Sequence, residues 1–408
     1  MKNKWMIPIC TLGISQWLGS CSDDTKGEPP NSRPPDETAP SAFVCPAEIT
    51  ELINVNDGED TVPSWESLDC FSKDLVRLPQ PNFLAGALAD LARYSEDRTT
   101  RNLGWVMYSD IDAQHATAVS NRSIWNNLSA VPPYVELETN TLYTFPLKPE
   151  WHEKKIRVAA AMLIAQKLKK RYTTAVFFYP PKMNWAPIAS SVADFKTWYT
   201  EHFIPEKIVE AKALERIQVE SYSPFQVELE TWVEWLPFAS STPVEEKVAL
   251  AQWMVDSLVP KLREHFKGSI TVHSYVNYEL KGSQWNTMNY EKFDLIGFSY
   301  FPICGGTNHE IYLQTQFENY LSVVSNSGNK KWGMTEIGPD EANWVGNGCM
   351  PRDEYSAKEL EIYSALIDKM EAIAPAPVAS GFPNKFVNTE TRKRVEAYVR
   401  SKIESIGN

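Results

Sequence analysis

The chain has 408 residues, a formal net charge of -12 and an ordinary globular composition, with 43% hydrophobic and 23% charged residues. This acidic balance, together with the lack of a basic cluster, argues against a nucleic-acid partner, because polyanion binding draws most of its affinity from clustered Lys and Arg. The 14 Trp, 17 Tyr and 17 Phe favour flat apolar ligands such as sugar rings, although a Trp-rich core explains the same numbers.

The N-terminus has the features of an export signal. Lys2 and Lys4 precede a short apolar stretch, which is too short to span a bilayer and is typical of a secretory signal. The stretch ends in LGSC, which resembles the lipobox of bacterial lipoproteins, with Cys21 as the residue that is lipidated. A plain signal peptide with a chance cysteine is the alternative. We therefore expect a signal peptide over residues 1–20 and a lipid on Cys21.

Residues 21–41 are polar and rich in proline, and they predict a disordered tether. The chain is then expected to be exported and lipid-anchored to a bacterial membrane. Ser22, rather than Asp, directly after Cys21 favours the outer membrane or cell surface if the host is Gram-negative. We expect a monomer whose contact with the membrane is made through this anchor.

Four of the six cysteines lie beyond residue 41, an even number that predicts two disulfides in an exported protein. Chain order suggests that Cys45 pairs with Cys70 and Cys304 with Cys349. Three connectivities are possible, and free thiols are the alternative. None of the cysteines has the CxxC spacing of a zinc site, and the sequence predicts neither a metal nor another cofactor.

From about residue 100 the chain alternates short β-branched or aromatic runs with longer amphipathic segments, which predicts parallel βα units. The expected strands are the eight segments 102–110, 134–143, 173–181, 219–230, 269–277, 294–302, 332–339 and 376–382. The expected helices include 153–172, 244–266, 310–328, 356–373 and 389–405. Thr389 is expected to cap the last of these helices, and Gly328 to end the third.

Eight strands, each followed by a helix, predict a (β/α)8 TIM barrel of the α/β class. No GxGxxG or GxxxxGK[ST] motif follows the first expected strand, which excludes the main nucleotide-binding folds. The predicted organisation is a barrel over 102–408, preceded by a short N-terminal extension over 42–101 that packs on it.

Acidic residues lie near the ends of two expected strands, where the active site of such a barrel is built. Glu228 lies near the end of the fourth strand and Glu336 near the end of the seventh. Carboxylates at these two ends would face each other across the barrel mouth, as glycoside cleavage requires. Glu230 is the alternative to Glu228, because strand alternation puts both on the same face.

Three segments resemble the clan A TIM-barrel retaining glycoside hydrolases. DLIGFSYFP (294–302) is similar to the strand-six segment of the endo-β-galactanase and endo-β-mannanase families, TEIG (335–338) to their nucleophile strand, and VELETW (227–232) to the mannanase acid/base segment. The resemblance covers roughly residues 100 to 400. It departs at Val227, where many members have an Asn that binds the sugar 2-hydroxyl. A branch without this Asn, a shifted assignment and a degenerate site all remain open.

The resemblance implies a double displacement on a β-linked polysaccharide, of mannan or galactan type, with endo action. Glu336 would be the nucleophile and Glu228 the acid/base, with their carboxyl groups about 5 Å apart. Tyr300 is expected to donate a hydrogen bond to Glu336. The second hypothesis, supported mainly by Val227, is a catalytically inactive barrel that binds glycans at the cell surface.

Several side chains near the strand ends are candidates for lining a sugar cleft, because a Trp ring can stack on a pyranose and an Asn can bind its hydroxyls. The candidates are Asn184, Trp185, Trp232, His273, Tyr275, Tyr300 and Trp344. Core packing is the alternative for each of them, above all for His273. A Cys304–Cys349 disulfide would tie the loops after the sixth and seventh strands together and brace one wall of the cleft.

Overall fold

The computed structural model describes residues 43–53, 62–77, 106–107, 149–168, 173–176, 189–225, 228–234, 236–276, 284–302, 309–338, 344–346, 348–373, 378–379 and 386–407. The chain divides into two units, Met1–Val44 and Cys45–Asn408, and the fold below is that of the second. The expected signal peptide, Cys21 and the tether lie outside the described residues.

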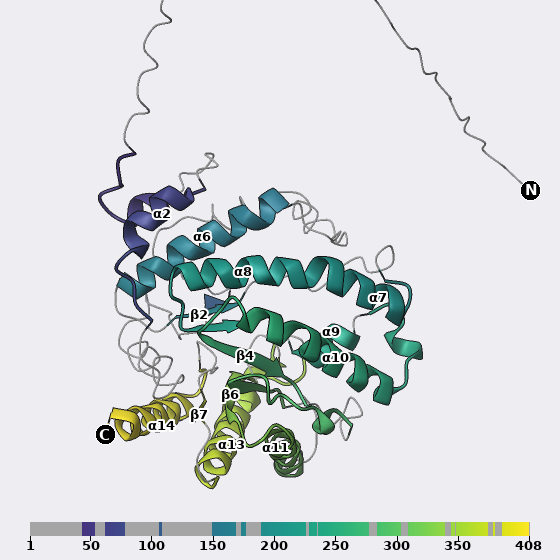
Figure 1. Ribbon diagram of the computed structural model, residues 1–408. Helices are drawn as coiled ribbons and strands as arrows, with labels where there is room; N and C mark the ends of the chain where they lie inside the picture. Colours follow the sequence, from purple (N-terminus) through teal and green to yellow (C-terminus); the bar gives the residue numbers. More distant parts are fainter. Residues whose placement is uncertain are drawn as a thin grey trace, which may run out of the picture. The chain divides into compact units, whose positions relative to one another are not determined.

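The described strands form one parallel sheet in which they follow one another in chain order (Figure 1). They are β1 (Val106–Met107), β2 (Thr174–Val176), β3 (Ser221–Ser223), β4 (Ser269–Ser274), β5 (Leu295–Tyr300), β6 (Lys331–Ile337) and β7 (Val378–Ala379). All residues of β5 are buried, as expected for a parallel strand covered on both faces. The α/β class is therefore confirmed.

Seven of the eight expected strands contribute to this sheet, and the eighth, over 134–143, lies outside the described residues. β1 pairs directly with β2, through Val106 opposite Ala175. Within the described part of the chain no pairing joins β7 to β1. Closure of the sheet into a full barrel thus stays a prediction.

Long helices follow the strands at the positions that the amphipathic segments predict. They are α6 (Pro149–Leu168), α10 (Val244–Arg263), α11 (His309–Asn326), α13 (Arg352–Glu371) and α14 (Thr389–Gly407). The shorter helical elements are α7 (Val192–Trp198), a π-helical turn (Tyr199–Phe203), α8 (Ile204–Arg216), α9 (Leu229–Glu234), and the 3-10 turns Ala239–Ser241 and Trp285–Thr287.

The ends of two helices show how local residues set their limits. Gly328 has φ +70 just beyond α11, a conformation that glycine adopts without strain, and the predicted end of this helix is confirmed. At α14 the expected cap is wrong by one residue. The side chain of Asn388, not Thr389, accepts from the N–H groups of Glu390 (2.8 Å) and Thr391 (3.3 Å).

The segment before the sheet is held by a disulfide, an ion pair and a cation–π contact. Cys45 and Cys70 form the predicted disulfide, which connects the segment preceding α1 (Thr50–Ile53) to α2 (Trp65–Ser72). Both helices contact α6. The guanidinium of Arg216 on α8 pairs with Asp69 and lies 4.5 Å from the ring centroid of Trp65.

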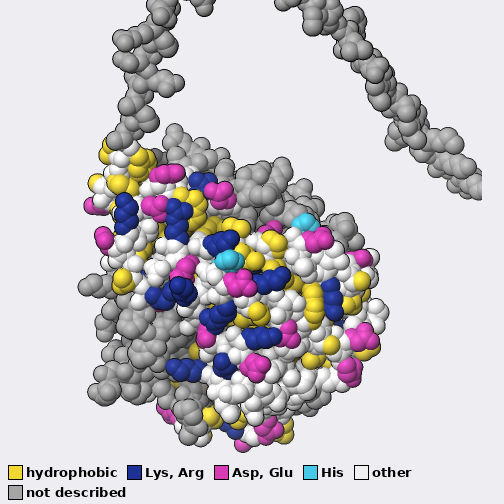
Figure 2. All heavy atoms as spheres, in the orientation of Figure 1, with side chains coloured by type: hydrophobic (Ala, Val, Ile, Leu, Met, Phe, Trp, Pro, Cys, Tyr) yellow, Lys and Arg dark blue, Asp and Glu magenta, His cyan; other side chains and the backbone are white. Residues whose placement is uncertain are grey.

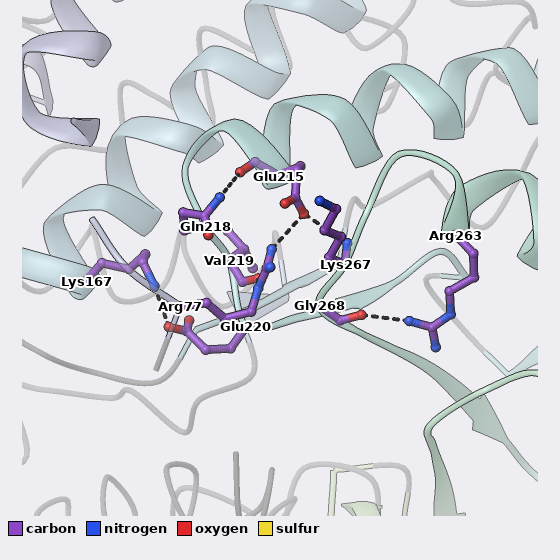
Figure 3. Close-up of polar contacts among 9 residues, drawn as sticks. All are labelled: Arg77, Lys167, Glu215, Gln218, Val219, Glu220, Arg263, Lys267 and Gly268. Atoms are coloured by element: carbon purple, nitrogen blue, oxygen red, sulfur yellow. Dashed lines mark hydrogen bonds and ion pairs between the residues drawn. The ribbon is translucent and has the colours of Figure 1, made fainter. Parts of the chain in front are cut away.

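A polar network lies at the amino-terminal end of β3 (Figure 3). Arg77 donates to the carbonyl of Val219 (2.9 Å) and to the carboxylate of Glu215 (2.8 Å). Next to it, the buried carboxylate of Glu220 accepts from Lys167 and from the N–H of Thr173 (2.9 Å). These contacts hold Arg77 and helix α6 against the start of β3.

Charged side chains of both signs lie on the surface of the described residues. Figure 2 shows Lys and Arg side chains interspersed with Asp and Glu on one face. Among the helices that the structure describes, none combines the length and the apolar character needed to cross a bilayer.

Candidate functional site

The segment after β3 is helical where the sequence predicts a continuing strand. The described residues from Leu229 to Glu234 form α9, and the N–H of Trp232 donates to the carbonyl of Glu228. Leu229, Trp232 and Val233 are buried, with the spacing of three and four residues that a helix face requires. The expectation that strand alternation places Glu228 and Glu230 on one face is therefore wrong.

The two faces of β5 differ in character. Phe298 stacks on Tyr320 of α11, with 4.4 Å between ring centroids, so its face is the one covered by that helix. Ser299 is the next residue, and successive side chains of a strand point to opposite faces. Its hydroxyl is therefore on the face away from α11, which we call the inner face.

Ser299 joins two titratable residues on the inner face. Its Oγ donates to Oε1 of Glu228 (2.8 Å) and lies 2.5 Å from Nε2 of His273. Ser299 is fully buried and His273 is 5% exposed, whereas Glu228 is half-buried. The second carboxylate oxygen of Glu228 accepts from Thr231 Oγ1 (3.3 Å). This arrangement brings the predicted residues Glu228 and His273 together.

Glu230 is held on the other face of the sheet. Its carboxylate accepts from the hydroxyl of Ser274 and from the N–H of Tyr275 (3.1 Å). Ser274 pairs in register with Phe298 and follows His273, so its side chain shares the face that α11 covers. Glu228 and Glu230 thus serve different faces although only one residue separates them.

Burial controls the ionisation of this cluster. It raises the pKa of Glu230 to about 7, and the nearby charge of Glu228 acts in the same direction, while the hydrogen bonds from Ser274 and Tyr275 oppose the shift. Burial also lowers the pKa of His273, against the attraction of Glu228. At neutral pH His273 is therefore neutral.

Glu336 lies on the strand beside Ser299. Phe298 pairs with Met334, but Ser299 pairs with Glu336. A β-bulge in β6 leaves Thr335 without a partner residue in the β5–β6 register. Without it, Thr335 would be level with Ser299. The described part of Glu336 is its backbone, which the bulge brings opposite the serine that binds Glu228.

The end of β6 is fitted closely to the end of β5. The N–H of Gly338 donates to the carbonyl of Tyr300 (2.8 Å). A Cβ at Gly338 would lie 2.8 Å from Cδ1 of Phe301, so the glycine of TEIG permits a close approach that a larger residue would prevent.

Tyr300 takes a position that differs from the expected one. It is 1% exposed, its ring centroid lies 5.9 Å from that of Tyr312 on α11, and burial raises its pKa. By strand alternation its side chain shares the face of Phe298 rather than that of Ser299. Tyr300 belongs to the core beneath α11, which corrects its assignment to the sugar cleft.

Two of the expected stacking tryptophans also lie in the core. Trp232 is 3% exposed and packs edge-on against Phe203, with centroids 5.2 Å apart. Trp344 is 4% exposed and lies between the rings of His309 and Tyr355. Both rings are covered by protein, so neither offers a face to a sugar.

Tyr275 is the one partly exposed residue among the expected cleft aromatics that the structure describes. Its ring meets Phe301 edge-on, with 5.6 Å between centroids. Asn184, Trp185, Val227 and Cys304 lie outside the described residues. Cys349 is disulfide-bonded to a cysteine outside these residues, so its pairing with Cys304 stays a prediction.

The described residues contain no group of three or more His, Cys, Asp or Glu side chains that could hold a metal ion. The described site residues are carboxylates, an imidazole and hydroxyls at or just beyond the ends of neighbouring strands. Such groups can transfer protons and stabilise positive charge that develops on a ligand.

Ser299 and Ser274 are the site residues that sequence reasoning did not single out. Ser299 lies within FSYF, where alternation alone places it on the face opposite the two aromatic residues beside it. A small polar residue at an inward position near a strand end was the signal that could have identified it.

No protein-family model matches the chain, and no curated protein matches it. Among solved structures, it is similar to a GH113 β-1,4-mannanase, with 11% identity over 61% of this chain and 79% of that chain and a TM-score of 0.36. It is also similar to a GH113 β-mannanase from Alicyclobacillus acidocaldarius in complex with ManMIm, with 12% identity over 62% of this chain and 78% of that chain and a TM-score of 0.35. A third similar structure is a hyperthermophilic β-glucosidase mutant, with 15% identity over 58% of this chain and 66% of that chain and a TM-score of 0.36. TM-scores this low identify neither a fold nor an activity.

Proposed function

We propose that this chain is a retaining glycoside hydrolase that cleaves a β-linked polysaccharide. One observation carries the proposal: Ser299 donates a hydrogen bond to Glu228 and pairs through its backbone with Glu336. Adjacent strands lie about 4.8 Å apart, and retaining enzymes need two carboxyl groups about 5 Å apart. We therefore propose that the carboxyl groups of Glu228 and Glu336 meet this requirement across Ser299.

In the proposed mechanism Glu336 attacks the anomeric carbon and Glu228 protonates the departing glycosidic oxygen. Glu228 then removes a proton from water, which displaces the sugar from Glu336 and restores both carboxyl groups. The half-buried Glu228 is accessible to a ligand, whereas Glu230 is 5% exposed and engaged by Ser274 and Tyr275 on the other face. This contrast favours Glu228 over Glu230 as the acid/base.

The finer properties of the enzyme follow from the motif resemblance. Mannan or galactan is the proposed substrate class, cleaved within the chain by a closed barrel. The ring of Tyr275, a partly exposed residue, is the proposed stacking surface for a sugar. Trp185 and Asn184 are proposed to extend this cleft.

We also propose that the enzyme is exported and anchored to a bacterial membrane by a lipid on Cys21, with residues 21–41 as the tether. Expression of the full chain in a bacterium, followed by partition between detergent and water, tests this. The wild type is expected in the detergent phase and Cys21→Ser in the aqueous phase. Equal partition of the two contradicts the anchor.

The activity is tested with the purified full chain and four polysaccharides: β-1,4-mannan, β-galactan, β-glucan and xylan. Reducing ends are expected from mannan or galactan, and both Glu336→Gln and Glu228→Gln should lose at least about 100-fold in rate. Glu371→Gln, an exposed residue at the end of α13, is the matched control and should keep full activity. Binding of a glycan without release of reducing ends would instead support an inactive glycan-binding protein.

A further inference from the structure

The hydroxyl of Ser299 has two polar neighbours and one proton. Glu228 Oε1 lies 2.8 Å away, and His273 Nε2 lies 2.5 Å away. A carboxylate accepts hydrogen bonds only, so the serine proton goes to Glu228. The contact between the neutral imidazole and Ser299 is then a hydrogen bond only if Nε2 carries the proton. The chain of bonds therefore runs from His273 through Ser299 to Glu228.

The order of these groups differs from that of a serine nucleophile. In a Ser-His-acid triad the acid binds the imidazole, which then removes the serine proton. Here the acid binds the serine hydroxyl directly, and Ser299 is fully buried. The arrangement is suited to fixing a carboxylate rather than to attack by Ser299.

The backbone places the imidazole within reach of Ser299. His273 pairs in register with Gly297, which precedes Ser299 by two residues and shares its face of β5. Gly297 has no side chain, so nothing on this face of β5 separates the imidazole of His273 from the hydroxyl of Ser299. His273 and Ser299 lie on adjacent strands, whereas Glu228 comes from the segment after β3.

We propose that His273 and Ser299 are positioning residues that orient Glu228 for proton transfer. They hold Oε1, whereas Oε2 accepts only the longer bond from Thr231 Oγ1 (3.3 Å) among the contacts described above, and Oε2 is the oxygen that delivers the proton to the leaving group and later receives one from water. This inference rests on the proposed glycosidase function for its kinetic consequence. The hydrogen-bond direction itself does not depend on activity.

The first test measures the histidine tautomer in the wild-type full chain by ¹⁵N NMR at neutral pH, with His273→Gln to assign the signal. The expected result is a neutral imidazole protonated at Nε2. Protonation at Nδ1 alone would overturn the proposal. Because this measurement needs neither substrate nor a destabilising variant, it decides the direction of the bonds even if no glycan is hydrolysed.

The second test is kinetic and uses two β-glycosides of the sugar that is cleaved, one with a good and one with a poor aryl leaving group. Only the poor leaving group needs the acid. His273→Phe and Ser299→Ala should slow cleavage of the glycoside with the poor leaving group by about 10- to 100-fold. They should slow cleavage of the glycoside with the good leaving group far less. His273→Gln, whose amide can donate from nearly the same place as Nε2, should restore most of the rate.

Equal slowing of both substrates in variants that retain the wild-type circular dichroism would overturn the proposal, because a general structural defect does not distinguish leaving groups. The same is true if His273→Gln is as slow as His273→Phe. If the wild type cleaves neither glycoside, the glycosidase function is contradicted. The tautomer measurement would still test the direction of the hydrogen bonds from His273 through Ser299 to Glu228.

Discussion

Glu228 and Glu230 are separated by one residue, yet their carboxylates bind serines on opposite faces of the sheet. Glu228 accepts from Ser299 on the inner face, and Glu230 accepts from Ser274 on the face that α11 covers. In a strand the two side chains would lie on the same face. Because α9 begins here, Glu228 is half-buried on one face and Glu230 is buried on the other.

This difference predicts different losses of activity. Glu228→Gln removes the proposed proton donor and should lower kcat on polysaccharide by about 10²- to 10⁴-fold. Glu230→Gln keeps a side chain that can accept from Tyr275 and donate to Ser274, and it should lose less than about 10-fold. Steady-state kinetics of the two variants provides the comparison. A larger loss from Glu230→Gln would reverse the assignment of the acid/base.

The raised pKa of Glu230 predicts a loss of stability with rising pH. The carboxyl titrates at 4.5 when unfolded and at about 7 when folded, so the folded state binds the proton more tightly. The stabilisation is complete below pH 4.5 and disappears as pH rises through about 7. The difference of pKa corresponds to roughly 3 kcal/mol in the free energy of unfolding.

Urea unfolding of the wild type and of Glu230→Gln, measured between pH 4.5 and 8, tests this dependence. The wild type should lose stability relative to the variant across the interval. Parallel curves would mean that Glu230 does not titrate there.

The buried pair of Lys167 and Glu220 predicts a strong asymmetry between single and double variants. Their side chains are 2% and 0% exposed. Lys167→Met leaves a buried carboxylate without its cation and should lower the free energy of unfolding by about 3 to 5 kcal/mol. Adding Glu220→Gln removes the charge and should recover part of this loss. Denaturant unfolding measures the cycle, and strict additivity of the two changes would rule out the coupling.

The Cys45–Cys70 disulfide closes a loop with a sequence separation of 25. By the chain-entropy relation, its removal in Cys45→Ala/Cys70→Ala should cost roughly 3.5 kcal/mol. The double variant is preferable to a reducing agent, because Cys349 is also disulfide-bonded. If the melting temperature of the variant equals that of the wild type, residues 45–70 contribute little to the stability of the whole unit.

The periodic parts of the chain were predictable because each depends on local pattern. Apolar runs predicted the strands 269–277, 294–302 and 332–339, and amphipathic spacing predicted helices such as α10 and α13. The disulfide between Cys45 and Cys70 followed from chain order.

The errors come from tertiary contacts. Leu229, Trp232 and Val233 bury one helix face after β3, which overrides the strand-like alternation of VELE. Tyr300 lies at the predicted strand end, but the face that its side chain takes is set by a tertiary contact, the packing of Phe298 on Tyr320. The register bulge at Thr335, which brings the Glu336 backbone beside Ser299, has no signature in the sequence.

The most direct test of the two-carboxylate site is the product formed by Glu336→Ala from an activated β-glycoside in the presence of azide. If Glu336 is the nucleophile, azide enters from the side that the carboxylate occupied, and NMR should show the α-glycosyl azide. Formation of the β-glycosyl azide, or a Glu336→Ala variant that still hydrolyses polysaccharide at the wild-type rate, would contradict the proposed role of Glu336.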